Sequence, residues 1–301
     1  MVSSEDSAWD IPPSMFGARS SGPTVQRLVL GSHLRRLREA RGLTAEQAAD
    51  SIRGSHSKIS RLEHGRVGFK DRDVADLLTL YGVNDGEERA ALLNLAKEAN
   101  TPGWWHAYSD VLPTWVEAYI GLEGAASVVR TYQTQFVPGL LQTEGYARSL
   151  LHTGYPTVTE DELSRRSELR VSRQEILSRP GAPQLWAVID EGALRRPVGG
   201  ADVMRDQIQH LMDMADHPAV TIQVLPFKVG GHAAGGGPFT ILRFAEPDLN
   251  DVIYVEQLTT ALYLDKPGDV DRYLDAMEQL CLQAAAAAGT PKLLRSILAE
   301  T

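Results

Sequence analysis

The sequence has 301 residues, a formal net charge of −9 and a hydrophobic fraction of 43%. This length suits two ordinary domains, and the composition is typical of a folded, water-soluble chain. The N-terminus lacks the basic and apolar regions of a secretory signal peptide, and no apolar run reaches the roughly 18 residues of a membrane helix. The single cysteine, Cys281, excludes an intramolecular disulfide and a cysteine-rich zinc site. We therefore expect a cytoplasmic protein of two domains that does not contact a membrane.

Charge is distributed unevenly along the chain. Residues 25–83 contain eleven Lys and Arg against seven Asp and Glu, whereas the other residues contain 19 against 32. A segment of net charge +4 is therefore attached to a remainder of −13. This asymmetry fits a protein that contacts phosphate groups through one part only.

The first 24 residues are rich in Ser, Gly and Pro and have no periodic apolar pattern. This composition predicts a disordered tail over residues 1–24. Helical periodicity begins at Val25, and Leu30, Leu34 and Leu37 share one face of a helix that ends at Gly42.

Four more short helices are predicted, which gives one all-α domain over residues 25–100. Thr44 is expected to cap the second helix, with Gln47 completing a capping box. Ser55 is expected to cap the third helix, and Gly65 closes it. The apolar positions that define the fourth and fifth helices are Val74, Leu77, Leu78 and Tyr81, and Leu92, Leu95, Ala96 and Ala99.

Residues 101–126 form an aromatic-rich connector. Its rings are Trp104, Trp105, Tyr108, Trp115 and Tyr119. Such rings could stack on nucleic-acid bases, but no Lys or Arg alternates with them as an electrostatic groove requires. We therefore expect the connector to pack on the second domain.

Residues 127–301 combine helical and strand-like patterns. Extended runs lie at residues 127–135, 185–190, 221–227, 239–244, 252–258 and 261–265, and helical runs lie at residues 142–151, 160–177, 204–215 and 270–284. The last run is expected to close the chain as one long amphipathic helix. Strands grouped in this way between helices predict an α+β domain with a mainly antiparallel sheet.

The segment from Leu30 to Val83 meets the geometric demands of a helix-turn-helix. Its two central helices must approach closely, which the small Ala48 and Ala49 allow, and the second must be anchored by Ile59 and Leu62. The opposite face must offer polar groups to a DNA major groove about 12 Å wide. The side chains on that face are His56, Ser57, Lys58 and Arg61.

The string SHSKISRLEHG, residues 55–65, resembles the phage-repressor type of helix-turn-helix, the XRE or Cro/C1 family. This resemblance implies a λ-repressor-like domain of five helices in which Ser55–His64 is the recognition helix. It implies that His56, Ser57, Lys58 and Arg61 contact bases. Arg61 is the best candidate for a bidentate bond to guanine O6 and N7.

The same resemblance assigns roles to residues outside the recognition helix. It implies that Thr44, Arg66 and Lys70 contact DNA phosphates, which position the protein without reading sequence. It also implies that Arg38 and Glu63 form a partly buried ion pair with a structural role.

Two positions depart from the family pattern. Ala45 stands where the family commonly has a phosphate-binding Gln, and Arg53 stands at the usual turn glycine, with Gly54 one place later. The first departure removes a phosphate contact, and the second predicts a locally altered turn.

The second half of the chain resembles the C-terminal module of a group of actinobacterial regulators that pair it with this helix-turn-helix. The strings that carry the resemblance are VRTYQTQFVPGLLQTEGYARSLL (129–151), VIDEGALRRPVGG (188–200), VLPF (224–227), GGPFTILRF (236–244) and ALYLDKP (261–267). The resemblance implies an antitoxin-like regulator that works with a small protein encoded nearby, or a regulator of development and antibiotic production.

No motif for catalysis, a cofactor or a metal is present in the sequence. The glycine-rich segment 229–238 lacks the Lys-Ser/Thr of a P-loop and the strand–GxGxxG–helix order of a dinucleotide site. The eight histidines lack metal-ligand spacing, and neither HExxH nor GxSxG occurs. We expect no enzymatic activity, no cofactor and no metal site.

Two roles for the second domain stay open. As an interaction module it would form a homodimer on a palindromic operator, with half-sites about 34 Å apart, and bind a small partner protein. As a sensor it would bind a small molecule between the sheet and the helices, with residues 231–237 as a gate. A broad exposed apolar patch would favour interaction, and a deep cavity with convergent polar groups would favour sensing.

Overall fold

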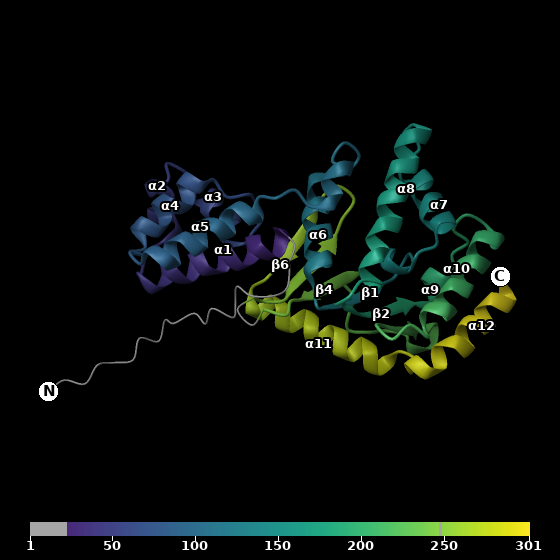
Figure 1. The fold of residues 1–301 in the computed structure, drawn as a ribbon. Coiled ribbons are helices and arrows are strands. Elements are labelled where there is room, and N and C mark those ends of the chain that lie inside the picture. The colour runs from purple at the N-terminus through teal and green to yellow at the C-terminus, as the bar shows by residue number, and fades with distance from the viewer. Residues whose placement is uncertain (1–22, 247–248) are drawn as a thin grey trace.

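The computed structural model describes residues 23–246 and 249–301, which form two domains joined by a helical connector (Figure 1). The predicted disordered tail lies outside the described residues, apart from Pro23 and Thr24. Both belong to α1 (Pro23–Ala40), so this helix begins two residues before the predicted start at Val25. Proline is tolerated in the first turn of a helix because the N–H groups there have no helical acceptor.

The described residues of the first domain form five α-helices, as predicted. Their bounds are α1 (Pro23–Ala40), α2 (Ala45–Ser51), α3 (His56–Glu63), α4 (Asp71–Leu80) and α5 (Gly86–Ala99). The apolar positions at helical spacing meet in one core, in which Leu30, Leu34 and Leu78 are fully buried. Burial of each such side chain contributes about 1.5–3 kcal/mol.

The closest approach in this domain brings α1 against the end of α3. A Cβ atom on Gly31 would lie 2.5 Å from Leu62 O and 2.7 Å from Glu63 O. These oxygens belong to the backbone and cannot swing away. Glycine therefore allows α3 to rest directly on α1.

The connector contains the 3-10 helix η2 (Trp104–Tyr108) and α6 (Thr114–Ala125). Tyr119 of α6 stacks on Tyr254 of the second domain, with ring centroids 4.1 Å apart. Trp104, in contrast, is 43% exposed and meets Trp105 and Tyr108 edge-on. Because α6 also packs against α1, the connector joins both domains.

The second domain is built on a mixed sheet with the strand order β3-β2-β1-β4-β5-β6. The bounds are β1 (Val128–Gln133), β2 (Gln184–Asp190), β3 (Val220–Leu225), β4 (Phe239–Arg243), β5 (Val252–Glu256) and β6 (Ala261–Leu264). The pairs β1–β2 and β2–β3 are parallel, and the other three pairs are antiparallel. The predicted α+β class is confirmed, with the parallel pairs arising where helices return the chain to the same end of the sheet.

Helices cover both faces of this sheet (Figure 1). Side chains of α6, α7, α10 and α12 share a core with one face, and α11 packs on the other. The helix bounds are α7 (Glu144–Gly154), α8 (Glu160–Gln174), α9 (Glu191–Arg195), α10 (Ala201–Met214), α11 (Pro267–Gln283) and α12 (Thr290–Glu300). Single 3-10 turns occur at η3 (Gly139–Leu141), η4 (Glu175–Leu177), η5 (Phe227–Val229) and η6 (Ala287–Gly289).

The prediction of one long closing helix is wrong, because the chain leaves α11 at Ala284 and continues to α12. The backbone N–H of Ala285 donates to Val224 O of β3 at 2.9 Å. Gln223 Nε2 donates to the carbonyl oxygens of Cys281 and Ala285. These contacts with β3 override the strong helix propensity of the alanine tract.

Candidate nucleic-acid interface

Side-chain caps fix both helices of the helix-turn-helix at their starts. Thr44 Oγ1 accepts a hydrogen bond from Gln47 N at 3.3 Å, and Gln47 Oε1 accepts one from Thr44 N at 2.8 Å. Ser55 Oγ accepts a hydrogen bond from Lys58 N at 3.2 Å. These bonds satisfy N–H groups that no helical carbonyl reaches, so α2 and α3 begin where the sequence predicts.

The turn between α2 and α3 keeps a left-handed residue at the position where the family pattern has glycine. Arg53 has φ of +51° and is the one non-glycine residue with positive φ in the described ranges. Gly54 N donates to Ala49 O at 2.8 Å and closes the turn. A residue with a Cβ pays about 1–2 kcal/mol for this conformation. The turn thus places Arg53, and not Gly54, in the left-handed conformation.

The two faces of α3 have opposite environments. Ile59 and Leu62 are buried in the core of the first domain. His56, Ser57 and Arg61 are exposed on the other face. Arg61 Nε donates to Ser57 O at 3.2 Å, which uses one of the five guanidinium N–H groups. An anchored inner face and an open polar outer face are what base reading from a helix requires.

The four predicted base-contacting residues differ in their exposure and in their ion-pair partners. Lys58 Nζ lies 2.5 Å from Asp73 Oδ2 of α4, and the Lys58 side chain is 29% exposed. His56 Nε2 lies 3.8 Å from Glu46 Oε1 of α2. The structure thus places His56, Ser57 and Arg61 together on the open face and holds Lys58 against α4. Contact of these residues with bases stays a prediction.

Arg38 and Glu63 form a bidentate ion pair between α1 and α3. Arg38 Nε donates to Glu63 Oε1 at 2.6 Å, and Arg38 Nη2 donates to Glu63 Oε2 at 2.9 Å. Arg38 Nη1 also donates to Leu43 O at 2.7 Å. The two side chains are 11% and 6% exposed, and the hydrogen bond to Glu63 raises the pKa of Arg38 above its usual value. The pair ties α3 to α1.

The three predicted phosphate contacts lie in two different surroundings. Thr44 and Lys70 are exposed at the starts of α2 and α4. Arg66 faces the second domain instead, where its Nη2 donates to Tyr263 O of β6 at 3.1 Å. Phosphate binding by all three stays a prediction, and for Arg66 it competes with this contact between the domains.

His64, the C-cap of α3, also contacts the second domain. His64 Nε2 lies 3.1 Å from Asp265 Oδ2, and its Nδ1 lies 2.5 Å from Ser60 O. Both oxygens are acceptors, so a protonated ring can donate to both. The contacts of His64 and Arg66 with the second domain were not predicted from the sequence. Tyr263, for example, is 197 residues from Arg66, and no local pattern connects the two.

A cavity of about 240 Å³ lies beside these contacts, between the two domains. Its walls come from α1, the end of α3, α6 and the sheet strands β4 to β6. Apolar side chains on the wall include Leu28, Leu122 and Phe244, and charged ones include Arg27 and Glu117. The cavity therefore lies at the domain boundary, not at the gated position within the second domain that the sequence suggests.

The glycine-rich segment 229–238 packs partly against the sheet. His232 Nε2 lies 3.1 Å from Tyr132 Oη, and Ala234 is buried in the core beneath α11. Burial, followed by the nearby charge of Asp190, raises the pKa of Tyr132 to about 12. Tyr132 is therefore a neutral hydrogen-bonding group that fastens this segment.

No three His, Cys, Asp or Glu side chains within residues 23–246 and 249–301 are grouped so that they could hold a metal ion. No helix in the same ranges is long and apolar enough to span a bilayer.

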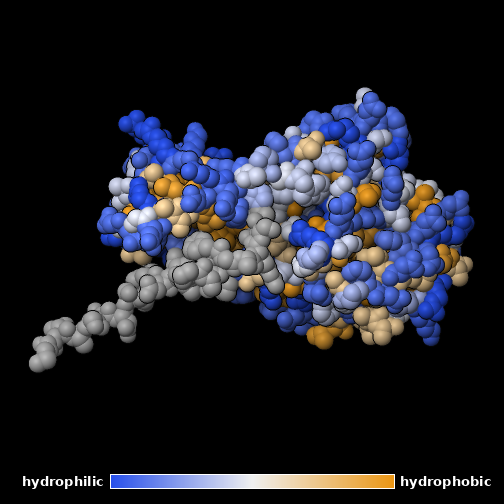
Figure 2. Space-filling view, in the orientation of Figure 1, coloured by the Kyte–Doolittle hydropathy of each residue, from blue (hydrophilic) through white to orange (hydrophobic). Residues whose placement is uncertain are grey.

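The surface in Figure 2 shows apolar residues in small separate groups among hydrophilic ones. The largest exposed apolar side chains include Phe227, Leu258 and Leu282, which lie on separate segments of the second domain. Among the described residues visible on this face, no broad apolar patch of the kind that would mark an extended protein interface is seen.

Two family profiles match the chain. One, described as a domain of unknown function (DUF5753), covers residues 116–296, and the other, described as a helix-turn-helix domain, covers residues 29–92. No curated protein and no solved structure matches the chain. The first profile spans all six strands of the sheet, and the second spans the capped pair α2 and α3.

Proposed function

Because the chain belongs to the family defined by the domain of unknown function DUF5753, here preceded by a helix-turn-helix domain, we propose that it is a sequence-specific DNA-binding regulator of transcription. We assign it to the XRE type and to the actinobacterial group of such regulators. It acts in the cytoplasm, without catalysis and without a cofactor. The observation that carries the proposal is the open polar face of α3 opposite a fully anchored inner face.

The geometry of α3 suits major-groove reading from its first turns. His56 and Ser57 occupy the first two positions of the helix, and Arg61 follows one turn later on the exposed face. In helix-turn-helix proteins the first residues of the recognition helix reach the base edges. The contacts with the second domain involve His64 and Arg66, at the other end, and so leave this face open.

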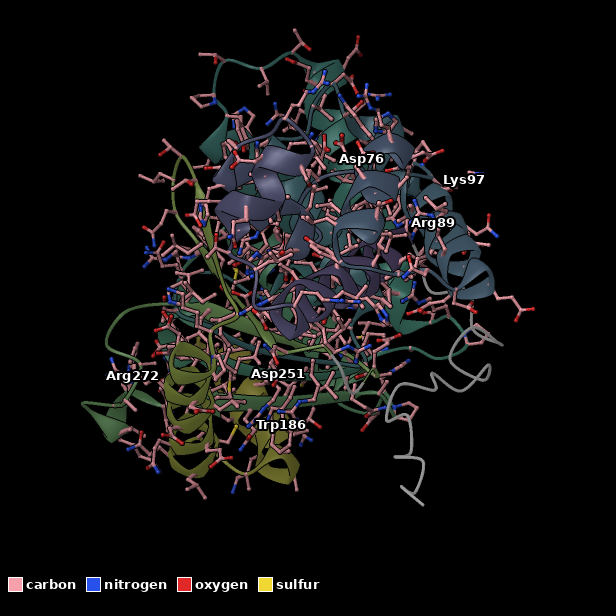
Figure 3. The ribbon with its side chains drawn as sticks, turned by 90° about the vertical axis from the view of Figure 1, so that its left-hand side faces the viewer. Asp76, Arg89, Lys97, Trp186, Asp251 and Arg272 are labelled. Carbon is pink, nitrogen blue, oxygen red and sulfur yellow. The ribbon has the colours of Figure 1, made fainter. Side chains whose placement is uncertain are left out.

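Removal of the Arg61 side chain tests the proposal. A binding site is first selected from a random duplex library with the full chain, and affinity is then measured by fluorescence anisotropy. Arg61→Ala is expected to weaken binding by on the order of 1–3 kcal/mol, about 5- to 160-fold, and to relax the preference at one guanine. The matched control is Arg272→Ala, which removes the same charge from α11, away from the helices of the first domain (Figure 3).

The two variants separate base reading from a general charge effect. Arg272→Ala is expected to leave affinity unchanged within twofold. If Arg61→Ala keeps both the affinity and the base preference of the unmodified chain, α3 is not the base-reading element.

We further propose that the second domain forms a homodimer, so that two copies of α3 read a palindromic operator. A dimer places recognition helices about 34 Å apart, one turn of DNA. The edge strand β6 offers unpaired backbone groups, and Leu258 and Leu262 are exposed on the hairpin that it forms with β5. Light scattering of the purified chain should give twice the monomer mass, and footprints should show two half-sites. A monomer mass at the operator-binding concentration contradicts this part.

Binding of a small partner protein, in an antitoxin-like role, is the remaining part of the proposal. Affinity purification from the native host is expected to recover a stoichiometric small protein. The alternative role, sensing of a small molecule, is favoured by the cavity of about 240 Å³ between the domains. Recovery of a bound metabolite instead of a protein supports this alternative.

A further inference from the structure

The cavity between the domains shares its wall with the end of the base-reading helix. Residues 63–66, which end α3 and begin the next loop, form one side of it. Tyr263 and Asp265, at the end of β6, form part of the other side. The same residues make the contacts Arg66–Tyr263 and His64–Asp265 across the boundary. Anything that fills the cavity therefore touches the groups that hold α3 to the second domain.

Several charged groups on the cavity wall are already paired. Glu63 binds Arg38, His64 binds Asp265, and Arg35 binds Glu39 at 2.9 Å. The two arginine–glutamate pairs contribute no net charge to the cavity.

Two guanidinium groups and one carboxylate of the wall remain outside such pairs. Arg27 Nε donates to Ala99 O at 2.7 Å, and Arg66 donates to Tyr263 O. Neither guanidinium lies within 4 Å of a carboxylate among the described residues, and the remaining acid is Glu117. Outside the carboxylate pairs the wall thus offers two guanidinium groups, Arg27 and Arg66, and one carboxylate, Glu117.

Arg27 is the more buried of the two guanidinium groups. Burial lowers the pKa of Arg27 from its usual value, and the charge of Glu117 only partly offsets this effect. A guanidinium has five donors in a planar fork, and a bidentate carboxylate is the acceptor that fits it best. An incoming anion would supply the counter-charge that Arg27 lacks.

Part of the remaining wall is apolar. Leu28, Leu122, Phe244 and Val252 line it, together with Trp105 of the connector. A volume of about 240 Å³ corresponds to about eight water molecules at liquid density, which is room for a small aromatic or aliphatic body. Ligand sites typically combine such an apolar wall with a few polar groups that fix orientation.

We propose that this cavity binds a small organic carboxylate, with its apolar body against α6 and β5 and its carboxylate on Arg27, and that occupancy changes the affinity of α3 for DNA. The coupling follows from the shared wall, because a ligand that separates residues 63–66 from β6 alters the contacts that position α3. The change in DNA affinity rests on the proposed DNA-binding function, whereas binding of a carboxylate in the cavity does not.

The first experiment measures carboxylate binding without DNA. Benzoate and phenylacetate are titrated into the full chain by calorimetry, with the neutral benzyl alcohol as comparison. Both carboxylates are expected to bind saturably and at least tenfold more tightly than the alcohol. Arg27→Gln is expected to weaken them about tenfold, and the matched Arg272→Gln to leave them unchanged.

A second variant tests the position of the site without removing a charge. Ala118 lies on the cavity wall in α6, so Ala118→Phe places a ring inside the cavity. It is expected to abolish binding of both carboxylates, while circular dichroism confirms that the helical content is kept. If neither carboxylate binds, or if Arg27→Gln and Ala118→Phe bind as the unmodified chain does, the site assignment is wrong.

The third experiment measures operator affinity with and without saturating benzoate. A change of threefold or more that is absent in Arg27→Gln supports the coupling, and an unchanged affinity refutes it. A chain that binds no operator under any condition refutes the proposed function, and the calorimetry still decides whether the cavity is a carboxylate site. The two failures are therefore distinguishable.

Discussion

The buried ion pair between Arg38 and Glu63 gives the sharpest prediction about stability. Glu63→Ala removes the acceptor of two hydrogen bonds, of 2.6 and 2.9 Å, and leaves the Arg38 guanidinium nearly buried. Removal of one partner of a buried pair costs about 3–5 kcal/mol because the other charge stays desolvated. Arg38 keeps its bond to Leu43 O and a 3.4 Å contact with the exposed Glu39, so we expect the lower end, about 3 kcal/mol.

Hydrogen exchange of the amides of α1 and α3 is the appropriate assay. A two-domain chain does not unfold in one step, so a single melting temperature would mix both domains. Exchange under native conditions reports the opening free energy of each helix separately. A loss of about 3 kcal/mol accelerates exchange by globally opening amides about 150-fold.

A double variant and a surface control complete the cycle. Arg38→Met combined with Glu63→Leu replaces both charges by apolar groups and is expected to recover most of the loss. Asp76→Ala removes a carboxylate from the exposed pair with Arg72 in α4, where the side chains are 44% and 76% exposed, and should cost under about 1 kcal/mol. If Glu63→Ala costs no more than Asp76→Ala, the pair between Arg38 and Glu63 does not hold α1 to α3.

Three further predictions follow from other contacts. Gly31→Ala places a methyl group against the backbone carbonyl oxygens of α3 and should lower the stability of the first domain by about 1–3 kcal/mol. Amide hydrogen exchange measures this loss, and an unchanged exchange rate in α3 would contradict the close approach. Burial lowers the pKa of His210 below its ordinary 6.5. The unfolded chain therefore binds more protons than the folded chain, and stability falls as the pH drops through 6.5 towards the folded pKa. His210→Gln should flatten this part of a plot of stability against pH, and an identical slope would refute the lowered pKa. Operator affinity should fall steeply between about 50 and 200 mM salt, and Lys70→Ala should reduce the slope of log K against log salt by about one, whereas an unchanged slope excludes that phosphate contact.

The helices of the first domain could be predicted because their signals are local. Thr44 caps α2 and Ser55 caps α3, and each side chain accepts a hydrogen bond from a backbone N–H three residues later. Ile59 and Leu62 are three residues apart, so spacing alone assigns them to one face. The pairing of Glu63 with Arg38 was implied by resemblance to the family, since no spacing rule connects Glu63 with a residue in another helix.

The features that the sequence did not predict depend on distant parts of the chain. The helix α12 beyond the predicted end at Ala284 was missed, and hydrogen bonds with β3 hold the chain there against the propensity of the alanine tract. Lys58 pairs with Asp73, which lies in another helix, and the periodicity of neither helix predicts this contact. The cavity at the domain boundary likewise exists only once α1 and β6 lie side by side.

The central place of β1 in the sheet has a consequence for synthesis on the ribosome. Val128 pairs with Gln184 on one side and with Arg243 on the other, so the sheet cannot close until the chain has been made to β4. The helices α1–α5 are complete by Ala99, 140 residues before β4 begins at Phe239. At about 5–20 residues per second this interval lasts about 7–28 s. Ribosome-bound chains truncated between Ala99 and Phe239 should contain a protease-resistant first domain. Cleavage within α1–α5 in such chains would show that the first domain needs the second domain to fold.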